Sequence, residues 1–188
     1  GLEDLEFKAR AEHIRAALEA TLPTPFAQAA DVIEASLAPA RLDDDLSALK
    51  VGDQGLAGWI VWSLGDYVAR QGQGDVPRAL RCLHALTQRF SAEFAIRPFI
   101  VAHQAQVLDT LGRWLDDPSP HVRRLISEGT RPRLPWGLRL QALVQDPSPC
   151  LPLLTALQDD PSEYVRRSVA NHLNDIATDH PSVVVDWV

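Results

Sequence analysis

The sequence predicts an all-α fold built from repeated helix pairs, on two observations. Apolar residues recur at helical spacing in successive segments, and no segment shows the period-two alternation of a half-buried strand between turn signals. Residues 117–136 (DPSPHVRRLISEGTRPRLPW) also have a partial echo 43 residues later, in residues 160–175 (DPSEYVRRSVANHLND). A period of this length is typical of HEAT-type repeats, which stack into α-solenoids. We therefore expect a right-handed α-solenoid of HEAT-like helical repeats with a concave binding face.

The individual helices follow from apolar spacing and from the prolines and glycines that end each run. They are expected over residues 2–22, 26–37, 58–70, 77–90, 101–115, 138–144 and 150–157, with one more helix opening in each of the two echoed segments. Residues 42–55 form an acidic, glycine-containing loop. Ser119 and Ser162 are expected to cap the two echoed helices. The large aromatic residues are expected in the core: Trp59, Trp62, Tyr67 and Trp114.

The composition is that of a folded chain without a membrane span. At 188 residues and 46% hydrophobic content the chain can bury a sizeable core, so we expect a single domain over residues 1–188. No apolar run is long enough to span a membrane, and the first residues, GLEDLEFKAR, do not resemble a signal peptide. Cys82 and Cys150 are expected to be reduced and buried, which favours a cytoplasmic location. The six histidines lack metal-ligand spacing, so no metal and no cofactor are expected.

The charge is negative overall and unevenly distributed. The formal net charge is −7, which argues against a chain that coats nucleic acid nonspecifically. Residues 121–140 nevertheless carry a single acidic residue, Glu128, among five arginines: Arg123, Arg124, Arg131, Arg133 and Arg139. A basic surface of this kind can bind phosphates. The alternative is that these arginines only pair with neighbouring acids.

The two echoed helices place polar residues at matched positions. In the second helix Val165, Val169, Leu173 and Ile176 form an apolar stripe that can face a neighbouring repeat. Arg167, Asn171 and Asp175 lie on another face of that helix, and Arg124 and Glu128 hold the corresponding face of the first. In register, Glu128 falls opposite Asn171. These polar positions are where we look for function.

Four blocks of sequence carry a resemblance to a known family. They are GWIVWSLGDYVAR, LTQRFSAEFAIRPFI, DPSPHVRRLISEGTRPRLPW and DPSEYVRRSVANHLNDIATDHP. Together they resemble DNA alkylation repair glycosylases built from HEAT-like repeats, nearer to the AlkC branch than to the AlkD branch. The resemblance runs from about residue 22 to the end of the sequence. It implies a monomeric, cofactor-free enzyme that excises N-alkylated bases such as N3-methyladenine from double-stranded DNA by hydrolysing the N-glycosidic bond.

The resemblance also implies roles for particular residues. The catalytic carboxylates would be Asp175, Glu128 and Glu93, and Trp136 would contact the substrate. The DNA would be held by residues of the two VRR segments, of RPRLPW and of the second echoed helix: Arg123, Arg124, Arg131, Arg133, Arg166, Arg167 and Asn171. Some members of the AlkC branch carry an Ig-like domain or extra C-terminal helices, which leaves open a further segment after Val188.

Each of these residues also has a simpler structural interpretation. Asp175 can pair with Arg167, Glu128 can bridge to Arg124 across one turn, and Trp136 can pack in the core. Glu93 can be an ordinary first-turn helix acid. A noncatalytic HEAT-type module that binds DNA or a protein is therefore the alternative to a glycosylase.

Overall fold

The structure, a computed structural model, describes residues 2–40, 42–45 and 49–187. These residues form helices and connecting segments, and the described part contains no strand, only two isolated bridges between Leu37 and Leu56 and between Gly52 and Gly55. The predicted all-α class is confirmed. The part of the predicted 42–55 loop at residues 46–48 lies outside the described residues. No helix in the described ranges is long and apolar enough to cross a membrane.

Contacts divide the chain into two compact units, Gly1–Arg41 with Asp45–Ala95, and Leu42–Asp44 with Ile96–Val188. The single domain over residues 1–188 therefore stays a prediction. The arrangement of the helices as a solenoid with a concave face also stays a prediction.

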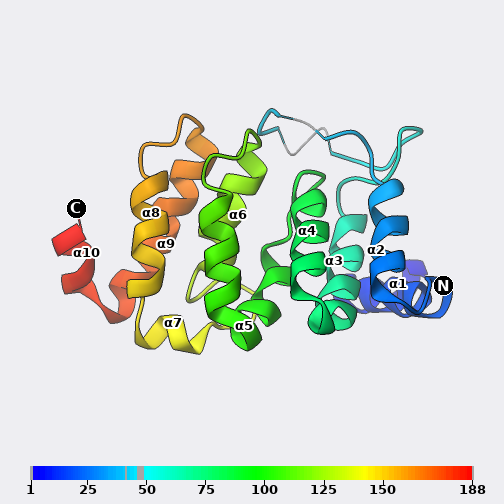
Figure 1. The fold of residues 1–188 in the computed structure, drawn as a ribbon, viewed down its shortest axis with the longest axis horizontal. Coiled ribbons are helices and arrows are strands. Elements are labelled where there is room, and N and C mark those ends of the chain that lie inside the picture. Colours follow the sequence, from blue (N-terminus) through cyan, green and yellow to red (C-terminus); the bar gives the residue numbers. More distant parts are fainter. Residues whose placement is uncertain (1, 41, 46–48, 188) are drawn as a thin grey trace. The chain divides into compact units, whose positions relative to one another are not determined.

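The first unit is a small helical bundle (Figure 1). Its elements are η1 (Leu2–Asp4), α1 (Phe7–Thr21), α2 (Phe26–Ala35), α3 (Ile60–Gln71), η3 (Gly72–Gly74) and α4 (Val76–Thr87). Helix α3 packs against α1 and α4, and α2 packs against α4. Asp75 caps α4 by accepting a hydrogen bond from the Arg78 backbone N–H at 3.1 Å. The helices predicted over this unit are confirmed within a few residues at their ends.

The aromatic residues are not all in the core as predicted. Tyr67 is buried and Trp62 and Trp114 are half-buried, but Trp59 is 64% exposed. Trp59 stands immediately before the first turn of α3, where its ring lies against that of Phe90 with a centroid distance of 4.8 Å. The core assignment of Trp59 was wrong because apolar spacing does not distinguish a residue at the helix start from one inside the helix.

The second unit begins within α5 (Glu93–Arg113), which starts at Glu93 rather than at residue 101 and has a kink at His103. Pro98 lies inside this helix. The elements that follow are α6 (Pro120–Thr130), α7 (Gln141–Gln145), η4 (Ser148–Cys150), α8 (Leu151–Leu157), α9 (Glu163–Asp179) and α10 (Pro181–Trp187). The sequence did not predict α10, because its three consecutive valines have low helix propensity.

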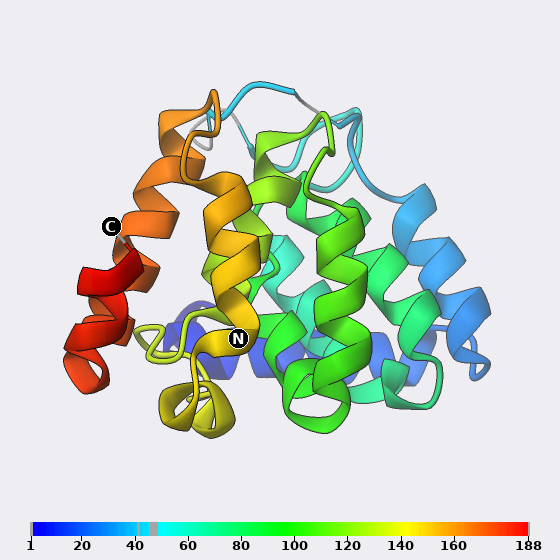
Figure 2. The ribbon, with the colours of Figure 1, turned by 60° about the vertical axis from the view of Figure 1, so that its left-hand side comes forward.

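Helices α6, α8 and α9 pack against one another, and α10 packs against α9 (Figure 2). Their core is apolar and buried: Val122, Leu125, Ile126, Leu153, Leu154, Leu157, Val165, Val169 and Ile176. Three of the four residues of the predicted stripe on α9 are therefore buried, and Leu173 is half-buried.

The two echoed segments begin with the same local geometry. In each, the aspartate Oδ1 accepts a hydrogen bond from the serine backbone N–H at 2.8 Å, which makes an Asx turn before α6 and before α9. Ser119 and Ser162 occupy the N-cap positions, but neither side chain makes a cap hydrogen bond. The prediction that these two hydroxyls cap the helices was therefore wrong. The aspartate two residues before each serine organises the turn instead.

An arginine links one echoed segment to the next. Arg123 donates from Nη1 to the Asp117 carbonyl at 2.6 Å, and Arg166 makes the matching bond to the Asp160 carbonyl at 2.5 Å. Arg123 also donates from Nε and Nη2 to the Asp160 carboxylate at 2.6 and 3.0 Å. In each echoed segment the arginine thus binds the Asp-Pro-Ser turn six residues before it. This contact is a shared element of the repeat architecture.

Candidate functional site

The C-terminal end of α6 supplies the first residues of the candidate site. Glu128 lies in the last turn of this helix, and its side chain is only 7% exposed. The helix stops after Thr130 because Arg131 precedes Pro132 and takes a non-helical conformation (φ −53, ψ 128). This turn lets the Arg131 guanidinium donate from Nη1 to Glu128 Oε1 at 2.8 Å.

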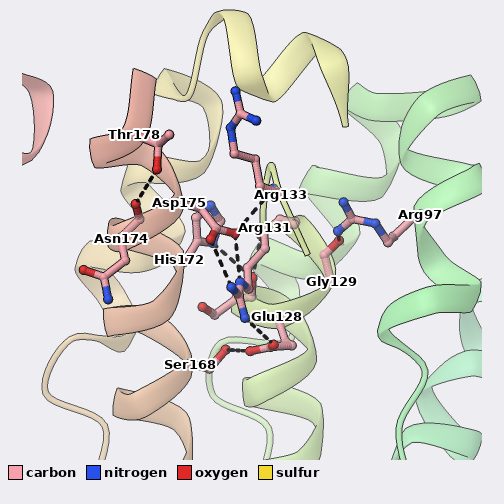
Figure 3. Close-up of polar contacts among 12 residues, drawn as sticks. Arg97, Glu128, Gly129, Arg131, Arg133, Ser168, His172, Asn174, Asp175 and Thr178 are labelled. Atoms are coloured by element: carbon pink, nitrogen blue, oxygen red, sulfur yellow. Dashed lines mark hydrogen bonds and ion pairs between the residues drawn. The ribbon is translucent and has the colours of Figure 1, made fainter. Parts of the chain in front are cut away.

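Helix α9 brings a second carboxylate to the same arginine (Figure 3). Asp175 accepts two hydrogen bonds from Arg131, from Nε at 2.9 Å and from Nη2 at 3.0 Å. Ser168, two turns earlier on α9, donates from Oγ to Glu128 Oε2 at 2.6 Å. Arg131 therefore holds Glu128 and Asp175 together, and we call these four residues the carboxylate cluster.

The cluster is largely shielded from water. The side chains of Arg131 and Asp175 are 11% and 13% exposed. Burial by itself would lower the pKa of Arg131, but the hydrogen bonds and charges of Asp175 and Glu128 outweigh it and raise that pKa. The two carboxylates share the Arg131 guanidinium. A second guanidinium, that of Arg124, lies 3.7 Å from Glu128 Oε1. Asp175 is the more exposed of the two carboxylates and is the one better placed to meet a ligand.

A buried histidine lies next to the cluster on α9. His172 Nδ1 is 3.0 Å from the carbonyl oxygen of Ser127, which fixes Nδ1 as the protonated nitrogen of the neutral ring. Its Nε2 has no hydrogen-bond partner among the described residues. Burial lowers the pKa of His172 to about 4. His172 therefore stays neutral around pH 7.

Trp136 is presented to solvent by a strained turn. It comes five residues after Arg131, is 86% exposed and has φ 63, a left-handed conformation that bulky residues rarely adopt. The core interpretation of Trp136 was wrong. Strain of this kind persists where the surrounding structure imposes it, and it is concentrated at functional sites.

The two simpler pairings considered for the carboxylates have different outcomes in the structure. Asp175 pairs with Arg131 and not with Arg167, which instead binds Glu163 one turn away at 2.7 Å. The bridge between Arg124 and Glu128 is present, with Arg124 Nη2 3.7 Å from Glu128 Oε1, and the Arg124 guanidinium also lies 4.8 Å from the centroid of the Tyr164 ring. The partner of Asp175 is therefore set by packing between helices, whereas Glu128 pairs with arginines close to it in the sequence.

Glu93 belongs to the first unit, while the other residues implied by the resemblance all belong to the second. Glu93 lies in the first turn of α5 and is buried. In the part of the chain that the structure covers, no group of three or more histidine, cysteine or acidic residues is arranged to hold a metal ion.

Two comparisons with known proteins match nearly the whole chain, although no family model matches it. A solved structure, Pseudomonas fluorescens alkylpurine DNA glycosylase AlkC bound to DNA containing an abasic site analog, superposes with a TM-score of 0.82 and 37% identity over 98% of this chain. Protein YhaZ of Bacillus subtilis (strain 168) is 38% identical over 181 residues, 96% of this chain.

The chain is thus similar to AlkC over nearly its whole length. The family resemblance seen in the four sequence blocks is thereby confirmed. The chain spans 47% of the AlkC chain and 46% of YhaZ, slightly less than half of either protein.

The arginines expected to hold DNA differ in how far their side chains are already engaged within the protein. Arg123 and Arg131 are occupied by the buried pairs described above, and Arg133 donates from Nε and Nη2 to the Asp179 carboxylate, both at 2.7 Å. Arg166, Arg167 and Asn171 are exposed on α9. The roles of all seven residues in DNA binding stay predictions, and the exposed ones are geometrically the better candidates.

Sequence reasoning missed three residues that support the site. Ser168 and His172 contact α6 from α9, and Arg97 donates to two backbone carbonyls on either side of the Trp136 turn. A signal was available for Ser168, because it replaces the apolar Leu125 at the matching position of the echo. Arg97 lay within the SAEFAIRPF motif, but nothing in that motif shows what an arginine there contacts.

Proposed function

We propose that the chain is part of a DNA glycosylase that excises cationic N-alkylated bases such as N3-methyladenine from double-stranded DNA. The observation that carries the proposal is the Asp175 carboxylate, fixed by two hydrogen bonds from Arg131 in the unit that also presents the exposed Trp136. The similar AlkC structure, an alkylpurine DNA glycosylase bound to DNA containing an abasic site analog, supports the same class of activity.

The reaction needs little acid catalysis from the protein. A methyl group on purine N3 makes the base cationic, so the electron pair of the breaking N-glycosidic bond neutralises the leaving base. The sugar passes through an oxocarbenium-like transition state, and water then forms the new bond to C1′ and gives up a proton. A carboxylate can stabilise the sugar cation and accept that proton. We assign this role to Asp175.

Glu128 and Glu93 would assist by charge. Both oxygens of Glu128 accept hydrogen bonds within the protein, from Arg131 and from Ser168. Glu128 therefore orients Arg131 toward Asp175 and adds negative potential that favours a cationic base over a neutral one. Glu93 is assigned to the same electrostatic role from the resemblance.

Trp136 would recognise the lesion. An indole ring exposed on a strained turn can stack on a sugar or on a positively charged base, and cation–π attraction contributes about 0.5–2 kcal/mol. The exposed cations of α9, Arg166 and Arg167, would contact the phosphates and make binding salt-dependent.

The test is release of N3-methyladenine from alkylated duplex DNA by the wild-type protein and by Asp175→Asn. The substitution keeps the size of the side chain and removes its charge, so we expect release to slow by about 10²–10³-fold, the usual effect of losing one electrostatic group. Asp109→Asn, which breaks an exposed ion pair with Arg113 on α5 of the same unit, is the matched control and should change the rate little. Unchanged release by Asp175→Asn would refute the assigned mechanism, and no release by the wild-type protein would refute the function.

A noncatalytic DNA- or protein-binding module is the second candidate. It is favoured by the bidentate geometry of Arg131 and Asp175, which is also that of a purely structural ion pair. This candidate predicts binding that is indifferent to Asp175→Asn and no base release by any variant.

A further inference from the structure

Arg97 is a charged residue in an unusual place. Its side chain is completely buried on α5, within the second unit. Its Nη1 donates to the Gly129 carbonyl at 3.0 Å (Figure 3). Its Nε donates to the Leu138 carbonyl at 2.5 Å. Burying a guanidinium is costly, so contacts of this kind are retained where they fix a particular geometry.

The two carbonyls flank one segment of chain. Gly129 follows Glu128 directly, and Leu138 stands two residues after Trp136. One guanidinium therefore holds both ends of residues 130–137, which we call the Trp136 loop. Within the loop, the Gly137 N–H donates to the Leu134 carbonyl at 3.1 Å, and the Leu140 N–H donates back to the Pro132 carbonyl at 3.2 Å.

The fit between Arg97 and the loop is close. A Cβ atom added at Gly137 would lie 3.3 Å from Arg97 Nε and 3.0 Å from Leu134 Cδ2, so a side chain at this position would crowd the guanidinium. Trp136, immediately before, holds its left-handed φ of 63. A strained residue on an exposed turn stays in place only if its flanks are fixed.

We propose that Arg97 is a positioning residue that fixes the Trp136 loop and so presents Trp136 to the DNA lesion. The inference rests on the proposed function for the identity of the ligand, but its geometry does not. The opposite side of the loop is held separately by Arg131 on Asp175 and by Arg133 on Asp179. Loss of Arg97 therefore affects the presentation of Trp136 and leaves the Arg131–Asp175 pair in place.

The variants are Arg97→Met, which removes both hydrogen bonds, and Arg97→Lys, which keeps the charge. Gly137→Ala disturbs the same contact from the loop side and serves if Arg97→Met does not fold. Arg89→Met is the matched control, because Arg89 also donates to two backbone carbonyls, those of Ala38 at 2.7 Å and Ala85 at 3.0 Å, but in the first unit.

The first measurement is a double-mutant cycle on binding to duplex DNA that contains an abasic-site analogue. Trp136→Ala should weaken binding by about tenfold in the wild-type and Arg89→Met backgrounds, as loss of an aromatic anchor does. In the Arg97→Met or Gly137→Ala background the same substitution should weaken binding less than about twofold, because Trp136 is already misplaced. Arg97→Lys should restore part of the effect. Equal effects of Trp136→Ala in every background would overturn the proposal.

The second measurement does not need DNA. Trypsin can cut after Arg133 and Arg139, on either side of Trp136, and does so when the loop opens. We expect cleavage at these two bonds to be about tenfold faster in Arg97→Met or Gly137→Ala than in Arg89→Met, at equal fractions of folded protein. Faster cleavage with no lesion binding by the wild-type protein would refute the glycosylase but keep the loop assignment. Unchanged cleavage would refute the assignment itself.

Discussion

Replacing Arg131 by methionine is the perturbation that bears most directly on the carboxylate cluster. Three nitrogen atoms of Arg131 donate hydrogen bonds, one to Glu128 and two to Asp175. Methionine fills a similar volume but leaves both carboxylates without their guanidinium. The expected result is a folded protein of much lower stability.

The magnitude follows from the burial of the cluster. The three charged side chains are between 7% and 13% exposed, so water replaces the lost hydrogen bonds poorly. Removing one partner of a buried ion pair costs about 3–5 kcal/mol, because the remaining charge is left uncompensated. This is a large part of the roughly 5–15 kcal/mol by which a typical domain is stable.

The assay is urea unfolding at pH 7 of the wild-type protein, Arg131→Met and Arg167→Met. Arg167 binds Glu163 on the surface, with side chains 68% and 73% exposed, so its loss should leave the unfolding midpoint unchanged within error. A triple variant, Glu128→Gln with Arg131→Met and Asp175→Asn, removes the unpaired charges and should recover at least half of the lost stability. A destabilisation by Arg131→Met below about 1 kcal/mol, the range of an exposed pair, would refute the reasoning.

Two further predictions concern residues that pack beside the cluster. Since burial lowers the pKa of His172 to about 4, the unfolded chain takes up its proton first, so stability is full above about pH 6.5 and falls by up to about 3 kcal/mol as the pH approaches 4. His172→Gln should flatten this dependence in urea titrations and the exposed His13→Gln should not, and equal slopes would contradict the assignment. Gly129→Ala should destabilise by about 1–3 kcal/mol, because its Cβ would lie 2.8 Å from Ile96 Cγ2. Gly112→Ala, whose Cβ would lie 4.0 Å from its nearest neighbour, should stabilise α5 by about 0.5–1 kcal/mol, and a similar response at both glycines would contradict the packing.

The helices could be predicted from the sequence because their determinants are local. Apolar spacing and the prolines located most of them, and the Asp-Pro-Ser echo located α6 and α9. The failures were also local in origin. The predicted helix began at residue 101, although α5 begins at Glu93 and continues through Pro98, and the valines of α10 concealed a helix that packs on α9.

The partners within the candidate site could not be predicted in this way. Asp175 was matched with Arg167 because both lie on α9, yet its partner Arg131 is 44 residues away. Which arginine reaches a carboxylate depends on the register between α6 and α9 and on the turn that Pro132 imposes after Arg131. Neither the register nor this turn can be deduced from the sequence of a single helix. The exposure of Trp136 likewise depends on a left-handed φ, which cannot be predicted from the residue types at this turn.

The repeat itself shows why the cluster arose at this point of the chain. In register with the echo, buried Leu125 of α6 corresponds to Ser168 of α9, and Glu128 corresponds to Asn171. A serine in an apolar position needs a hydrogen-bond acceptor, and a buried carboxylate needs donors. The Ser168 hydroxyl meets Glu128 Oε2 at 2.6 Å, so each departure from the repeat satisfies the other. The Asp-Pro-Ser turns preserve the architecture on one side of this contact. On the other side, the turn after Arg131 leaves the repeat and carries Trp136 into solvent.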